Sequence, residues 1–95
     1  MVTCYDAATS KILNETSVDA LLVGDSCAMV VHGFDSTIHA TLEMMVAHTA
    51  ATRRGAPDKV IVADMPFLSF RGSVEAATQS VMQLMRAGAN GVKLE

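Results

Sequence analysis

Acidic side chains recur just after short apolar segments of this 95-residue sequence, where they could bind a cation. Asp25 and Asp64 each follow an almost continuous apolar run, and Lys93 and Glu95 lie in the last apolar segment. In a strand, Lys93 and Glu95 would leave the same face because they are two residues apart. Carboxylate oxygens suit Mg²⁺, and an amine beside them would bind an anionic substrate. Bound ligands of this kind would also offset the cost of placing charges in a covered sheet.

Short apolar segments alternate with segments of helical spacing. The apolar segments are typical of strands covered on both faces in a parallel sheet, and they span residues 1–5, 18–24, 59–63 and 92–95. Helices are predicted between them, one over residues 7–15, one capped by Thr41 and ended by Gly55, and one capped by Ser73. Residues 26–40 form the longest stretch that we expect to be irregular.

The resulting order, β-α-β-α-β-α-β, predicts a parallel sheet with right-handed crossovers. The pattern is compatible with a doubly wound sheet and with part of a barrel. No glycine-rich phosphate-binding fingerprint follows the first strand. This absence argues against a doubly wound sheet that binds a nucleotide. Arg53 and Arg54 would complement the dipole at the end of the second helix. The third helix is predicted to bury one face, made of Val74, Ala77, Val81, Leu84 and Gly88.

If the strands are neighbours, the polar residues at their carboxyl ends converge on one rim, which is where α/β folds form their sites. Those residues are Asp25, Ser26, Asp64, Lys93 and Glu95. Two simpler interpretations stay open. Either aspartate could be a turn or cap residue, and residues 92–95 could form an ordinary exposed edge strand. The three histidines lack partners at ligand spacing and are interpreted as structural or surface residues, namely His32, His39 and His48.

Composition excludes several classes of function. The net charge of −3, without a basic run, argues against binding to nucleic acid or to an anionic membrane. No apolar run approaches the roughly 20 residues that span a bilayer, and no signal peptide is visible, so a cytoplasmic location is expected. Cys4 and Cys27 form no CxxC pair, which favours buried free thiols over a zinc site or a disulfide.

Four segments in register carry a resemblance to a known family. They are LVGDS at 22–26, RRGAP at 53–57, ADMPF at 63–67, and RAGAN at 86–90 followed by VKLE at 92–95. The pair Tyr5-Asp6 resembles the end of the family's first strand. Together these segments resemble ketopantoate hydroxymethyltransferase, in order and over nearly the whole chain. Each motif alone is modest, and the four in register are highly specific.

The resemblance implies a (β/α)₈ TIM barrel of the phosphoenolpyruvate/pyruvate type, with residues 1–95 forming one partial barrel domain of strands one to four. It implies transfer of a one-carbon unit from 5,10-methylenetetrahydrofolate to 3-methyl-2-oxobutanoate, giving 2-dehydropantoate for pantothenate and coenzyme A synthesis. Carried over by motif, Asp25, Asp64 and Glu95 would surround Mg²⁺. The 2-oxo acid would be bound by Asp25, Asp64, Ser26, Lys93 and Tyr5.

The resemblance also implies what residues 1–95 would lack. The family's general base is a glutamate of the second half of the barrel, so we expect no catalytic base here and little activity from this chain alone. Open edge strands should favour self-association, and the family forms homo-oligomers. Two alternatives are an inactive half-barrel that serves as an assembly module and a magnesium-dependent 2-oxo acid lyase or mutase of related fold.

Overall fold

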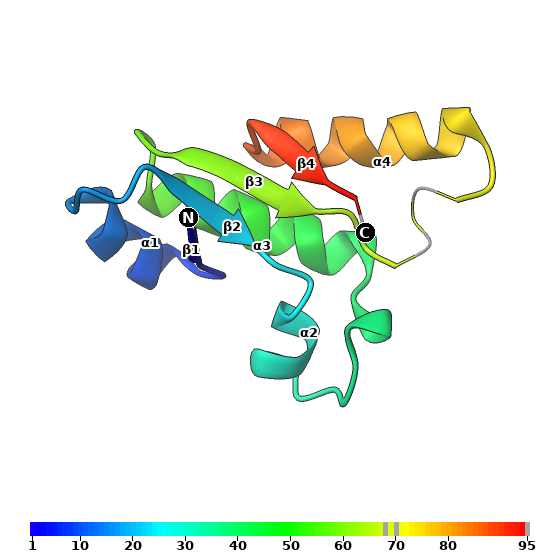
Figure 1. Cartoon of the computed structure of the whole chain (residues 1–95), viewed down its shortest axis with the longest axis horizontal. Helices are drawn as coiled ribbons and strands as arrows, with labels where there is room; N and C mark the ends of the chain where they lie inside the picture. Colours follow the sequence, from blue (N-terminus) through cyan, green and yellow to red (C-terminus); the bar gives the residue numbers. More distant parts are fainter. Residues whose placement is uncertain (68, 70, 95) are drawn as a thin grey trace.

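Four parallel strands form a single sheet in sequence order, β1-β2-β3-β4 (Figure 1). The computed structural model describes residues 1–67, 69 and 71–94. Each strand pairs only with its sequence neighbours within this part of the chain. The strands are β1 (Val2–Thr3), β2 (Ala20–Val23), β3 (Val60–Asp64) and β4 (Gly91–Lys93).

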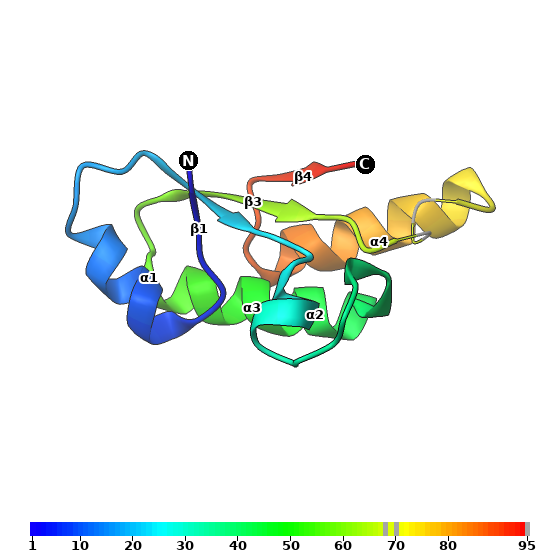
Figure 2. The same cartoon turned by 60° about the horizontal axis from the view of Figure 1, so that its bottom comes forward.

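The helices lie on one side of this sheet, and the other side is open (Figure 2). They are α1 (Ala7–Asn14), α2 (Cys27–Val30), α3 (Leu42–Gly55) and α4 (Val74–Ala87), with a 3₁₀ turn, η1 (Thr37–His39). A doubly wound sheet reverses its strand order and carries helices on both faces. Sequential order with helices on one face is the arrangement of a (β/α) barrel. The predicted α/β barrel class is confirmed, and the doubly wound alternative is wrong.

Side-chain caps explain where the three longer helices begin. Asp6, Thr41 and Ser73 each accept a hydrogen bond from the backbone N–H three residues later, at 2.7, 3.1 and 3.0 Å. Gly88 ends α4 with a φ of +124°, in the region that favours glycine. A Cβ at Gly88 would also lie 2.6 Å from Cγ of Arg53, so this position excludes a side chain for two reasons.

The core lies between the sheet and the helices. Alternate residues of β2 and β3 are fully buried against it, and they contact apolar side chains of α3 and α4. These residues are Leu21, Val23, Ile61, Ala63, Met45 and Leu84. The intervening residues Leu22 and Val62 face the open side and are half-buried. Both predicted thiols, Cys4 and Cys27, are free and buried.

Arg53 joins three elements at the opposite end of the sheet from the predicted site. Its guanidinium donates five hydrogen bonds of 2.6 to 3.1 Å, to the backbone oxygens of Gly88, Ala56, Pro57 and Lys59 and to Oδ1 of Asn90. The same Asn90 oxygen accepts from the backbone N–H of Ile61 in β3. Arg53 therefore connects the end of α3 to β3 and to the end of α4. This role goes beyond the predicted interaction with the helix dipole.

Two local predictions are wrong. Residues 26–40 are not irregular throughout, because α2 begins directly after Ser26 and η1 begins after Ser36. Such short helices have too few turns to show helical periodicity. Val74 is 85% exposed rather than buried, since the first turn of α4 extends beyond the sheet. Within the described residues, no helix has the length and apolar character needed to cross a bilayer.

Candidate active site at the carboxyl ends of the strands

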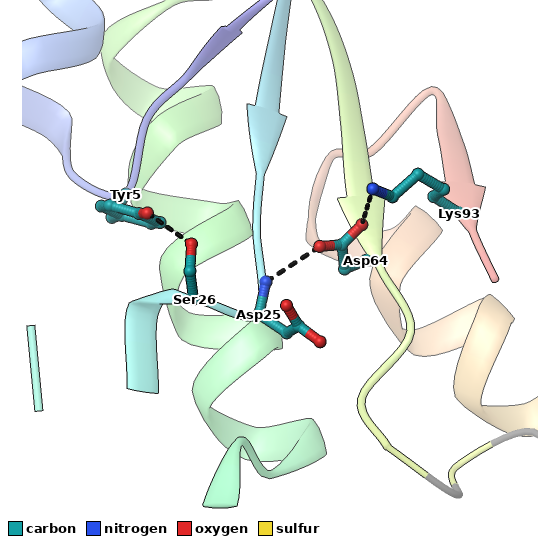
Figure 3. Close-up of polar contacts among 5 residues, drawn as sticks. All are labelled: Tyr5, Asp25, Ser26, Asp64 and Lys93. Carbon is teal, nitrogen blue, oxygen red and sulfur yellow. Dashed lines mark hydrogen bonds and ion pairs between the residues drawn. The ribbon is translucent and has the colours of Figure 1, made fainter. Parts of the chain in front are cut away.

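The residues predicted for the site gather at the carboxyl ends of all four strands (Figure 3). Asp64 is the last residue of β3, and it is aligned with Lys93, the last residue of β4. Asp25 and Ser26 follow β2, and Tyr5 follows β1. The structure therefore brings together five of the six residues that sequence reasoning selected. The sixth, Glu95, lies outside the described residues.

Asp64 is the centre of the polar cluster and is only 5% exposed. Its Oδ2 accepts a hydrogen bond of 3.0 Å from the backbone N–H of Asp25, which joins the ends of β2 and β3. Its Oδ1 lies 3.4 Å from Nζ of Lys93, an ion pair without hydrogen-bond geometry. Burying a carboxylate is costly unless its oxygens are satisfied. The incompletely satisfied Oδ1 is thus an oxygen suited to a cation.

Tyr5 and Ser26 form a second pair on the β1 side of the rim. The Tyr5 hydroxyl and Oγ of Ser26 are 2.6 Å apart, a strong hydrogen bond in which either oxygen could donate. Gly24 lies between this pair and Asp64. A Cβ at Gly24 would be 3.2 Å from Oγ of Ser26 and 3.6 Å from Oδ2 of Asp64, so the glycine leaves room at both oxygens.

Sequence reasoning missed a pair of histidines, of which His48 contacts the rim and His32 contacts His48. Nδ1 of His48, on α3, is 2.7 Å from the backbone oxygen of Tyr5. Nε2 of the same ring is 2.9 Å from Nε2 of His32. The partners are 43 and 16 residues away from His48, so no local spacing could have revealed them. The third histidine, His39, instead lies 3.6 Å from a carboxylate oxygen of Asp35.

A magnesium ion at this rim would have two candidate carboxylate ligands among the described residues, Asp25 and Asp64. Among the described residues, no group of three or more His, Cys, Asp or Glu side chains lies close enough to hold a metal ion. Mg²⁺ keeps several waters in protein sites and binds through one or two carboxylates. Oδ1 of Asp64, which has an ion pair but no hydrogen bond, would suit such an ion, and Asp25 lies close to it (Figure 3).

The acidic rim also acts on Cys27, at the start of α2. Burial raises the pKa of the Cys27 thiol, and the negative charges of Asp25 and Asp64 raise it further, against backbone hydrogen bonds that lower it. The thiol is fully buried. A thiol with a raised pKa is a poor nucleophile at neutral pH because the thiolate is scarce. Cys27 is therefore expected to be a structural residue rather than a nucleophile.

Comparison with known proteins identifies the family to which this site belongs. The family model described as ketopantoate hydroxymethyltransferase matches residues 1–95. Proteins named 3-methyl-2-oxobutanoate hydroxymethyltransferase are 54% identical in Thermosipho africanus, 50% in Leptospira interrogans and 48% in Coxiella burnetii, each over 100% of this chain. The chain spans 36% of the length of each of these relatives. It belongs to the ketopantoate hydroxymethyltransferase family, whose named members are one-carbon transferases.

Proposed function

We propose that this chain carries the cation-binding and oxo-acid-binding part of an enzyme that makes 2-dehydropantoate. The reaction would add a hydroxymethyl group, derived from 5,10-methylenetetrahydrofolate, to 3-methyl-2-oxobutanoate, in the route to pantothenate and coenzyme A. The observation that supports this most is the buried carboxylate of Asp64, which lies between the backbone of Asp25 and the amine of Lys93.

Asp25 and Asp64 would hold Mg²⁺, directly or through water, and Glu95 is the third candidate ligand. A bound Mg²⁺ supplies a Lewis acid that makes the C3–H of the oxo acid more acidic. The carboxylates contribute by position, because the hydrogen bond from the backbone of Asp25 holds the Asp64 side chain in one orientation. That prior ordering reduces the reorganisation needed when the ion and the substrate bind.

Lys93, Ser26 and Tyr5 would bind the oxo acid. The ammonium group of Lys93 would attract the substrate's carboxylate while staying near Asp64. When the Tyr5 hydroxyl donates to Oγ of Ser26, the Ser26 proton is free to donate to a substrate oxygen. These three side chains would orient the substrate at the carboxyl ends of the strands.

Removal of the C3 proton needs a base, and we propose that this base comes from outside residues 1–95. Among the described residues, the carboxylates of Asp25 and Asp64 lie at this rim, and we assign both of them to the cation. A carboxylate bound to a divalent ion is a weak base. In this proposal the folate co-substrate is also bound by residues beyond this chain, and the activity belongs to the assembled enzyme.

The test is calorimetric titration of 3-methyl-2-oxobutanoate into the protein, with and without Mg²⁺. We expect binding that requires Mg²⁺, and a loss of affinity of roughly a hundredfold or more in Asp64→Asn, since a charged ligand is removed from a buried site. The matched control is Asp19→Asn, which removes an exposed carboxylate just before β2, at the other end of that strand.

Magnesium-independent binding, or equal affinity in the Asp64→Asn variant, would contradict the assignment. An absence of binding under all conditions would favour the alternative in which this half-barrel is only an assembly module. Circular dichroism and the thermal midpoint of each variant should be compared with those of the unmodified protein, because Asp64 also joins two strands.

A further inference from the structure

The pair of histidines beside Tyr5 has a geometry that the proposed function does not use. We propose that His32 and His48 form a second cation site, for a borderline divalent ion such as Zn²⁺ or Cu²⁺. Their Nε2 atoms face each other at 2.9 Å, from the segment after α2 and from α3. The rings are nearly perpendicular, with an interplanar angle of 77° and centroids 5.2 Å apart.

The protonation pattern of His48 leaves Nε2 as a ligand atom. A backbone carbonyl can only accept, so Nδ1 of His48 must donate its proton to the oxygen of Tyr5, at 2.7 Å. In the neutral ring, Nε2 then carries a lone pair. Histidine ligands of metal sites almost always donate their other N–H to a carboxylate, a backbone carbonyl or water, which fixes the tautomer and the ring orientation. His48 has this arrangement before any metal binds.

His32 supplies the second ligand by a change of tautomer. In the metal-free pair, Nε2 of His32 must carry the proton that it donates to Nε2 of His48. With that proton on Nδ1 instead, both Nε2 lone pairs would point into the same space. His32 is exposed, so its Nδ1–H would be hydrated at little cost.

The distance between the rings nearly matches that of a zinc site. Two imidazole nitrogens at about 2.0 Å from a tetrahedral ion are roughly 3.3 Å apart. From the observed separation of 2.9 Å, the exposed His32 ring must move outward and rotate until both Nε2 lone pairs are directed at the ion. His48 is half-buried and is held by Tyr5, so it can stay in place. Water would complete the coordination shell.

The ligand type separates this site from the carboxylate rim. Imidazole nitrogen suits Zn²⁺, Cu²⁺ and Ni²⁺, whereas carboxylate and water suit Mg²⁺. A cation on the histidine pair would link α3 to the segment after α2, next to the Tyr5 that contacts Ser26. The inference does not depend on the proposed function, because it concerns different residues and a different class of ion.

The probe is Zn²⁺, titrated calorimetrically into the protein in excess Mg²⁺, which competes with Zn²⁺ for carboxylate oxygens but not for imidazole nitrogens. We expect one bound Zn²⁺, and an affinity lower by roughly tenfold or more in His32→Gln. His39→Gln is the matched control, since His39 is also exposed and pairs with Asp35. The exposed position of His32 makes its substitution compatible with folding.

A second measurement needs no variant. Trace Cu²⁺ should broaden the imidazole NMR signals of His32 and His48 before those of His39. Equal broadening of all three, unchanged Zn²⁺ affinity in His32→Gln, or no Zn²⁺ binding would each overturn the proposal. The Asp64→Asn variant should still bind Zn²⁺ even if it no longer binds the oxo acid. A failure of one proposal can therefore be distinguished from a failure of the other.

Discussion

At the scale of single residues, Asp64 combines a structural contact with the cation-binding role that we propose for it. One oxygen is used to join β2 to β3, and the other is left with an ion pair of 3.4 Å. The carboxylate is thereby fixed in place without being fully satisfied. An oxygen held in this way can accept a cation with little reorganisation. The hydrogen bond from Asp25 joins the ends of two strands, which differs from the turn or helix-cap interpretation of Asp64.

Cys27 gives a residue-scale prediction of pH dependence. Its pKa in the folded protein is raised above the ordinary value of 9.0, so the folded state holds this proton more tightly than the unfolded state. The stability gained in this way is complete below about pH 9 and is lost as pH rises through the folded pKa. We expect the free energy of unfolding to fall more steeply above pH 9 in the unmodified protein than in Cys27→Ala.

The measurement is urea unfolding at a series of alkaline pH values, because the difference between the two proteins cancels the titration of lysine and tyrosine. Identical slopes for the two proteins would show that the environment of Cys27 does not favour the thiol. Alkylation offers a check on accessibility, since the fully buried thiol should react slowly in the native state.

At the scale of elements, Arg53 is the main connection between α3, β3 and α4. Lysine at this position would keep the charge but lose the planar set of donors that reaches five oxygens. We expect Arg53→Lys to lower the free energy of unfolding by about 2–3 kcal/mol, because several carbonyl groups lose a charged donor. Chemical denaturation measures this change.

Arg54→Lys is the matched control, because Arg54 is the next residue of α3 and is exposed. The control should change stability by less than about 0.5 kcal/mol. Similar stabilities for the two variants would mean that the hydrogen bonds of Arg53 are replaced by water without loss. The thermal midpoint should follow the same order.

At the scale of the whole molecule, the sheet has two free edges and one uncovered face within the described residues (Figure 2). Apolar side chains lie along them, and Val2, Val60 and Leu94 are 38%, 49% and 58% exposed. Unpaired strand edges with apolar neighbours favour association. We expect this chain to self-associate, with a sedimentation coefficient that rises with protein concentration. A concentration-independent monomer would contradict the prediction.

Much of the architecture followed from local patterns in the sequence. Thr41 and Ser73 cap their helices as predicted, and the apolar runs before Asp25 and Asp64 form the central strands. The first and last residues of the strands were less predictable: β2 begins at Ala20, whereas the predicted strand begins at Val18. Apolar periodicity marks which residues can be buried, whereas the limits of a strand depend on where a neighbour pairs with it.

The order of the strands and the contacts across the rim required the folded chain. Alternating strands and helices are compatible with two sheet topologies, and the order β1-β2-β3-β4 distinguishes them. The sequence could place Asp25 and Asp64 at strand ends because each follows an apolar run, whereas Lys93 was predicted within a strand of residues 92–95 and in fact ends β4. It could not pair His32 with His48, or His48 with Tyr5, since those contacts join residues whose separation in the chain has no periodic relation. Local interactions set the elements, and the packing of α3 against the sheet sets which side chains meet.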